Sequence, residues 1–172
     1  MALKWRDIIM AVANCTFPSY IALFFYDPEG SFLTHVFGFA AYWWLLSEFY
    51  LKFLPALVDE PPLSHLKVLN IIHAVNVGPT ACYLLFSSAQ LRPALASILT
   101  LSVTPETFTA ADPRATMLIA CTTSFFLFDL YRLPIWAVRD PAMIAHHVLS
   151  LVMWPVAVHY DFAAVYLLIF IR

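Results

Sequence analysis

Charged side chains are scarce in this chain of 172 residues, since only 12% of them are Asp, Glu, Lys or Arg. An ordinary soluble domain contains about a quarter charged residues. The formal net charge is only −2, and no run of like charges occurs that would form a basic or acidic tail. The composition is therefore not typical of a soluble domain, and we expect no nucleic-acid partner.

Cysteines are also too few and too isolated for a disulfide framework. Cys15, Cys82 and Cys121 lie singly in separate apolar runs, without Cys-x-x-Cys or Cys/His spacing. The sequence has no nucleotide, haem or metal motif. We therefore predict neither a metal nor a bound cofactor, and we interpret the three cysteines as small buried apolar side chains.

Apolar residues are abundant: 62% of the chain is hydrophobic, 16% is aromatic and the mean hydropathy is +0.80. A helical membrane span needs about 20 apolar residues, so this length allows five or six spans. Near-continuous hydrophobicity favours helices over barrel strands, which alternate with period two. The apolar runs are Ile8 to Phe25, Phe32 to Leu54, Val68 to Phe86, Met117 to Trp136, Ala142 to Val158 and Phe162 to Ile171. We predict an all-α polytopic membrane bundle, with a first span and loop at 1–32 and the main domain at 33–172.

The positive residues predict an orientation for these spans. Inner loops carry an excess of Lys and Arg. With the N-terminus inside, only Arg92 and Arg114 fall on the outer side. The inner side then holds Lys4, Arg6, Lys52, Lys67, Arg132, Arg139 and Arg172. We therefore predict an inner N-terminus and, because no small-residue cleavage site follows, an uncleaved first span.

Two segments are too short to cross a bilayer. Phe162 to Ile171 would form about 15 Å of helix, half of a bilayer core. It is either an interfacial or re-entrant piece or, as we favour, a last span cut short in a chain that continues beyond Arg172. The longest connection, Gln90 to Arg114, has an apolar centre and is predicted to be an interfacial helix or a lid.

The adjacent histidines His146 and His147 lie inside a predicted span. Ionisable side chains in hydrocarbon cost a few kcal/mol, so by default they face the bundle interior or a wet cavity. Neighbours on a helix point about 100° apart, so only one can face a given site, as nucleophile or general base. Ser150 and Trp154 follow at helical spacing and would line the same wall. The alternative is that both histidines only bond neighbouring helices.

Asp129 is the second candidate for chemistry. It shares a helical face with Thr122, Phe125 and Arg132. Asp129 either pairs with Arg132 one turn later or orients a histidine across the bundle by fixing its tautomer. Arg132 is also long enough to reach the inner interface by snorkelling.

A polar stripe is predicted in the preceding span, where Asn70, His73 and Asn76 recur every three residues. Such residues either join helices by hydrogen bonds of about 1 kcal/mol each or line a lipid-binding cavity. Glu48, which lies among aromatic residues, is expected to reach headgroups or to pair with Lys52.

Three short motifs resemble a known family. Ser124-Phe125-Phe126-Leu127-Phe128-Asp129, then His146-His147-Val148-Leu149, with Asn70 to His73-Ala74 earlier in the chain, are similar in order and separation to the TLC homology domain. The similarity covers roughly residues 33–172. It is closer to the general TLC-domain proteins than to ceramide synthases, because the Arg-x-Gly and His-Asp-x-x-Asp elements of the latter do not occur here.

The resemblance implies a bundle of about six helices around a lipid-accessible cavity, typically in the endoplasmic reticulum. The mitochondrial inner membrane is the other compartment considered. Ceramide synthases are acyl-CoA transferases, which makes His146, His147 and Asp129 the catalytic candidates and acyl-CoA a co-substrate. The resemblance leaves two functions open. One is binding or remodelling of a membrane lipid, which is an acyl-chain lipid, a sphingolipid or a phospholipid. The residues expected to line its site are Asn70, His73, Asn76, Arg132, Ser150 and Trp154. The other function is that of a non-catalytic accessory subunit that packs against other membrane proteins.

Overall fold

Helices account for nearly all of the described chain. The computed structural model describes residues 31–53, 63–132, 141–162 and 164–170, and within these ranges it contains no β-strand. The helices are α2 (Phe32–Phe53), α3 (Leu63–Ser87), α4 (Leu91–Leu99), α5 (Pro105–Thr109), α6 (Pro113–Arg132), α7 (Pro141–His159) and α8 (Ala164–Phe170). The predicted all-α class is confirmed.

Among the described residues, two helices are long and apolar enough to cross a membrane, namely Leu69–Ser87 within α3 and Pro141–His159, which is α7. Their mean hydropathies are 1.3 and 1.5. The predicted count of five or six spans is therefore not confirmed by the described residues. In α6 the hydroxyl and charged side chains lower the hydropathy, and the run predicted at Ile8 to Phe25 lies outside the described residues.

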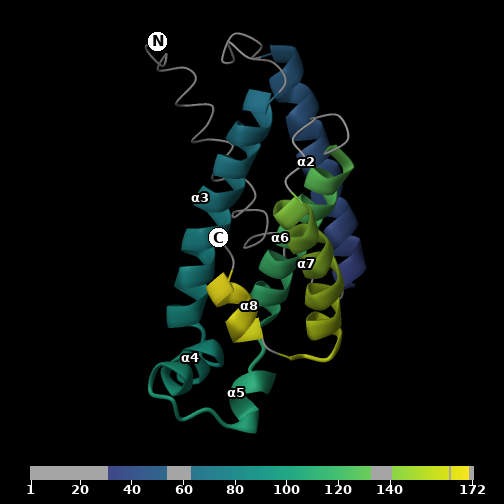
Figure 1. The fold of residues 1–172 in the computed structure, drawn as a ribbon. Coiled ribbons are helices and arrows are strands. Elements are labelled where there is room, and N and C mark those ends of the chain that lie inside the picture. The colour runs from purple at the N-terminus through teal and green to yellow at the C-terminus, as the bar shows by residue number, and fades with distance from the viewer. Residues whose placement is uncertain (1–30, 54–62, 133–140, 163, 171–172) are drawn as a thin grey trace.

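α6 is the central helix of the bundle (Figure 1). It packs most extensively against α2, and it also contacts α7, α3 and α8. Three hydroxyl groups in the middle of α6 bond to carbonyl oxygens of their own helix: Thr122 donates to Leu118, Thr123 to Ile119 and Ser124 to Cys121. These polar groups are thereby satisfied without a partner helix, which lets α6 be buried on almost every side.

α7 contacts the rest of the bundle along one narrow stripe. Its buried residues are His147, Ser150 and Trp154, which recur at helical spacing. Apart from the exposed His146 and His159, most of the remaining surface is apolar, and its large exposed hydrophobic residues are Met143, Val148, Leu149, Val152, Met153 and Val156. An apolar face of this extent is unfavourable in water and suits contact with lipid.

The long connection between α3 and α6 forms two short helices, α4 and α5, at one end of the bundle (Figure 1). α4 buries Leu91 and Leu95 against its neighbours. α5 is held by Phe108, which stacks on both Phe162 and Tyr166 with ring centroids 5.4 Å apart in each pair. The connection is therefore structured and docked on the start of α8.

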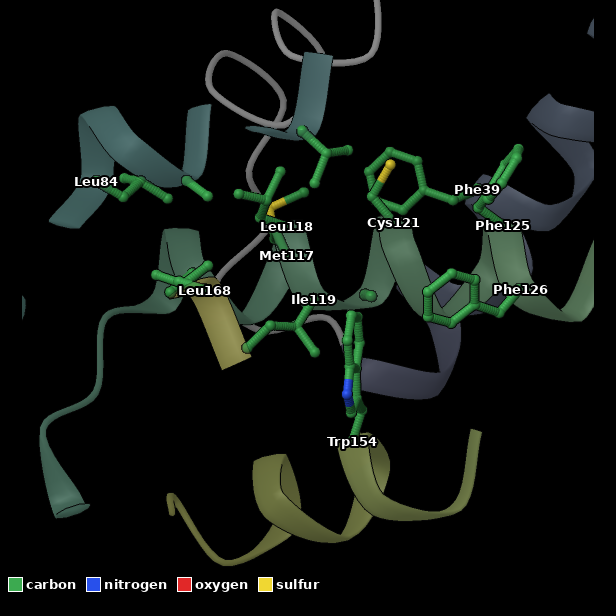
Figure 2. Close-up of a cluster of buried hydrophobic side chains, with 14 of the residues drawn as sticks. Phe39, Leu84, Met117, Leu118, Ile119, Cys121, Phe125, Phe126, Trp154 and Leu168 are labelled. Atoms are coloured by element: carbon green, nitrogen blue, oxygen red, sulfur yellow. The ribbon is translucent and has the colours of Figure 1, made fainter. Parts of the chain in front are cut away.

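The apolar core surrounds α6. Figure 2 shows Trp154 extending from α7 toward α6, near Phe126. Leu168 of α8 lies beside α6 farther from Phe126. Cys121 belongs to this core, as predicted, whereas Cys82 is exposed on the outer face of α3, which corrects the expectation that it is buried. Cys15 lies outside the described residues.

Candidate functional site

The polar side chains of the candidate site gather near one end of the bundle. α6 ends at Arg132 and α7 begins at Pro141, so Asp129 in the last turn of α6 meets His147 in the second turn of α7. Both side chains are buried, with whole-residue exposures of 5% and 7%. The site therefore lies between two helices that are apolar in most other positions.

Asp129 Oδ2 lies 3.2 Å from His147 Nδ1. The two atoms are at ion-pair distance, but Nδ1 does not have the alignment of a hydrogen bond. We therefore describe the contact as electrostatic. Catalytic hydrogen bonds are often long or misaligned before substrate binds. Of the two arrangements considered for Asp129, the structure has the one that faces a histidine across the bundle.

His146 points elsewhere, as the 100° angle between helix neighbours requires. It is exposed, whereas His147 is buried, and their ring centroids are 5.5 Å apart. His146 touches the edge of Phe126 with a centroid distance of 5.6 Å. The structure thus places one histidine inside the bundle and the other at its side.

Phe126 organises the interior histidine. Its ring stacks on His147 at 4.6 Å with an interplanar angle of 19°, and it also contacts Trp154 at 5.3 Å. Phe126 precedes Asp129 by three residues, so both face α7. Ser150 is buried on the same stripe of α7 as His147 and Trp154, which is the common wall that their spacing predicts.

Arg132 pairs with Glu48 of α2 and not with Asp129. Its NH2 group donates to Glu48 Oε1 at 2.5 Å, and its guanidinium lies 5.1 Å from the centre of the Trp44 ring. Glu48 thereby joins α2 to α6, a contact that the sequence analysis did not predict. The intrahelical Asp129–Arg132 pair, which was the other possibility for these residues, is not formed.

The polar stripe of α3 is only partly brought together. His73 and Asn76 are buried, but Asn70 is exposed. Residues three apart on a helix are offset by about 60°, so two such steps turn Asn70 about 120° away from Asn76. Asn76 donates from Nδ2 to the carbonyl of Ile72 in its own helix.

His73 lies in an aromatic junction of α2, α3 and α6. Its ring stacks on Phe125 at 4.2 Å and meets the edge of Trp43 at 5.9 Å. Trp43 is fully buried and donates from Nε1 to the carbonyl of Cys121 at 3.4 Å. His73 Nε2 is buried without a hydrogen-bond partner. This environment gives His73 an aromatic packing role and one unused polar atom.

Sequence reasoning missed two residues that shape the site. Phe126 carried a signal, because it shares a helical face with Asp129. For Glu48 the sequence indicated only that a partner exists, since a carboxylate in an apolar helix requires one. That partner is 84 positions away in the chain, and no local spacing identifies it.

A small cavity lies at the opposite end of α7, where α6 begins and α8 follows. Its volume of about 10 Å³ gives room for a single water, and its lining includes Thr116, Asp161 and Leu167. Among the described residues, no group of three or more His, Cys, Asp or Glu side chains is placed to hold a metal ion.

A search of curated proteins and a search of solved structures found no match to this chain. A family model described as TLC domain matches residues 65–172. That range contains nearly all of α3 and the whole of α4 to α8, and therefore Asp129, His146 and His147, whereas α2 with Glu48 lies before it. Members of this family are membrane proteins, in agreement with the two apolar helices of the structure. Since the match covers more than half of its length, the chain belongs to the TLC domain family.

Proposed function

We propose that this protein binds an acyl-chain lipid in the membrane and remodels it by acyl transfer. The observation that carries the proposal is the buried pair of His147 and Asp129 between two apolar helices. A buried carboxylate beside an imidazole costs desolvation, and this cost is a common mark of a functional pair. Family membership supports a lipid-related role in general terms.

The pair has the composition of a general base with an orienting carboxylate. With Asp129 accepting from Nδ1–H, the Nε2 atom of His147 is left as the basic nitrogen. In the proposed step, Nε2 takes the proton of an acceptor hydroxyl or amine as that group attacks the thioester carbonyl of acyl-CoA. The carbon–sulfur bond breaks and the thiolate receives the proton, which leaves an acylated acceptor and free CoA.

His146 has a different place in this proposal. It is exposed on the side of α7 that carries the apolar surface, 5.5 Å from His147. A lipid that approaches α7 laterally would meet His146 before His147. We therefore assign His146 to contact with the incoming lipid and His147 to the proton transfer.

The same proposal includes the setting in the cell. We propose a multi-pass protein of the endoplasmic reticulum with the Glu48–Arg132 end of the bundle on the inner, cytoplasmic side. Support comes from the positive residues at this end, since Lys52 is in the last turn of α2 and Arg132 is in the last turn of α6. The assignment to the endoplasmic reticulum is based on the family resemblance.

The test is acyl transfer by the purified protein in nanodiscs, with a labelled long-chain acyl-CoA and mixed lipid acceptors, followed by lipid mass spectrometry. His147→Ala should abolish turnover, and Asp129→Asn should reduce it. His159→Ala is the matched control, because His159 is an exposed histidine at the far end of the same helix. Equal turnover in the His147 and His159 variants would refute the proposal.

A non-catalytic accessory subunit is the second candidate. The observation that favours it is the exposed apolar face of α7, which another membrane protein would cover as well as lipid does. In that case the Asp129–His147 contact acts as a link between α6 and α7. Native mass spectrometry of protein extracted gently from its membrane separates the two: a defined large assembly without a lipid adduct supports the subunit.

A further inference from the structure

A second polar cluster lies beside the Asp129–His147 pair, where α2 and α6 approach their ends. It consists of Trp44, Glu48, Tyr131 and Arg132, and we call it the arginine cluster. Arg132 is its centre: one nitrogen pairs with Glu48, and the guanidinium lies 5.1 Å from the Trp44 ring centre. The Trp44 and Tyr131 ring centroids are 5.3 Å apart.

The arginine has unused binding capacity. Its side chain is only 9% exposed, and its Nε–H has no hydrogen-bond partner in the part of the chain that the structure describes. A buried, unpaired donor on a charged group costs free energy, so its persistence requires an explanation. Arginine presents its donors as a planar fork that matches two oxygens of a phosphate. The unpaired Nε–H is therefore available to donate to an oxygen of a bound anion.

The other half of the cluster suits a cation. Glu48 is half exposed, at 51% of its side chain, although it already bonds to Arg132. Trp44 and Tyr131 are 42% and 58% exposed beside it. A carboxylate next to exposed aromatic rings is the usual environment for an ammonium or quaternary ammonium group. The cluster thus offers a cation site adjacent to an anion site.

We propose that the arginine cluster binds the headgroup of a zwitterionic phospholipid, with the phosphate on Arg132 and the ammonium against Glu48 and the two rings. The inference rests on the proposed lipid-binding function and names its lipid class. The Arg132–Glu48 pair has no net charge, and neither has a phosphocholine or phosphoethanolamine headgroup. Opening one ion pair to accept the headgroup makes two, whereas an anionic headgroup without an ammonium group would replace the Arg132–Glu48 ion pair by only one.

The position of the cluster supports a lipid rather than a soluble phosphate ester. Asp129 and Arg132 are one turn apart on α6, so a headgroup at Arg132 lies near the His147 site. Long cationic side chains near the ends of membrane helices reach the headgroup region. An acyl chain from the same lipid would then run along the exposed apolar surface of α7.

The test is native mass spectrometry of the purified full chain in detergent with an equimolar mixture of phosphatidylcholine, phosphatidylethanolamine, phosphatidylglycerol and diacylglycerol. The wild type should retain the two zwitterionic lipids over the others. Glu48→Gln should shift retention toward phosphatidylglycerol, because Arg132 then lacks its ion-pair partner. For a half-exposed carboxylate we expect the ratio of zwitterionic to anionic lipid to fall about threefold to fivefold.

Two further variants serve as controls for this test. Glu106→Gln makes the same chemical change on an exposed residue of α5 at the opposite end, and it should leave the ratio unchanged. Trp44→Leu keeps an apolar side chain but removes the ring, and it should lower phosphatidylcholine retention without favouring phosphatidylglycerol. Soluble glycerophosphocholine at the same concentration should not compete, and full competition by it would overturn the lipid as the source of the headgroup.

The results that overturn the inference differ from those that overturn the proposed function. Retention of lipid without headgroup preference, or an unchanged ratio in Glu48→Gln, would leave lipid binding intact and reduce the cluster to a link between α2 and α6. Failure to retain any of the four lipids would overturn both. Normal headgroup selection combined with full acyl transfer in His147→Ala would support the cluster and refute the catalytic proposal alone.

Discussion

The carboxylate of Asp129 lies 3.2 Å from the imidazole of His147, and this contact joins α6 to α7 across their buried surfaces. The two side chains are 18 positions apart in the chain, and each is surrounded by apolar residues. A charge placed there interacts more strongly than at a surface, because little solvent screens it. The interaction between the two side chains should therefore contribute measurably to the free energy of unfolding.

We expect a double-mutant cycle of Asp129→Ala and His147→Ala to show a coupling of about 1 kcal/mol in the free energy of unfolding. Each single variant leaves its partner buried without a counter-group, which costs about 1–3 kcal/mol. Unfolding in mixed micelles followed by circular dichroism gives all four values. The same cycle with the exposed His146 is the control, and its effects should add within about 0.5 kcal/mol. Additive effects in the His147 cycle would contradict an interaction between the two side chains.

A second prediction concerns the unpaired nitrogen of His73. Replacing His73 by Phe keeps a ring against Phe125 and removes a buried polar atom that has no partner. Because such an atom costs free energy, we expect His73→Phe to raise the free energy of unfolding by about 1 kcal/mol. His159→Phe, on an exposed histidine, should change it by less than about 0.5 kcal/mol.

The outcome for His73 also bears on function. If the unused Nε2 atom holds a lipid group, His73→Phe should stabilise the protein and still lower acyl transfer. A variant that is stabilised and fully active would assign His73 to packing alone. A destabilised variant would show that the nitrogen has a partner in the membrane.

Helix positions were predictable from the sequence because burial in a membrane protein leaves long apolar runs. The predicted runs at Phe32 to Leu54 and Ala142 to Val158 agree with α2 and α7 within two residues at each end. The outward position of His146 relative to His147 also follows from helix geometry. These features depend only on neighbours along one helix.

Partners across the bundle were not predictable in the same way. Asp129 had two possible partners, Arg132 within the helix and a histidine on another, and local spacing favoured neither. Which partner Asp129 contacts depends on how α2 approaches α6, because Arg132 pairs with Glu48 and Asp129 then faces His147. A single sequence contains no information about that approach. Asn70 is exposed for a simpler reason, because the rotation of a three-residue spacing accumulates along the helix.

A third prediction concerns the end of α4. The chain leaves this helix through two bonds, from Leu101 N–H to Ile98 and from Ser102 N–H to Ser97, which form a Schellman motif. Leu101 takes the left-handed conformation, with φ of 56°, and is 91% exposed. Glycine is the residue that this position favours, since a left-handed leucine costs about 1–2 kcal/mol.

We therefore expect Leu101→Gly to raise the free energy of unfolding by about 1 kcal/mol, measured by chemical denaturation in micelles. Leu99→Gly is the matched control, because Leu99 is equally apolar and also exposed but has helical geometry. Glycine inside a helix costs about 1 kcal/mol, so this variant should be destabilised. A loss of stability in Leu101→Gly would mean that its side chain makes a compensating contact.

The last prediction is a pH dependence at the start of α6. Asp112 precedes the helix, and its Oδ1 accepts from the backbone N–H of Arg114 at 2.9 Å. Its Oδ2 accepts from the Arg114 guanidinium at 2.8 Å. Burial opposes the charged form, but hydrogen bonds from the Arg114 side chain, the Ser88 hydroxyl and the Arg114 backbone outweigh it and hold the pKa of Asp112 below its ordinary value of 3.8.

A pKa that is lower in the folded state favours folding wherever the carboxylate is ionised in both states. The contribution of Asp112 should be complete above the ordinary pKa of 3.8 and decline as the pH falls through that value toward the lower folded pKa. At pH 7, Asp112→Ala should lower the free energy of unfolding by about 1 kcal/mol through loss of the cap and the ion pair. Asp112→Asn should keep the backbone bond and lose only the acid-dependent part. Denaturation of the three proteins at pH 7 and pH 3 gives the comparison, and an equal difference between wild type and Asp112→Asn at both pH values would contradict the depressed pKa.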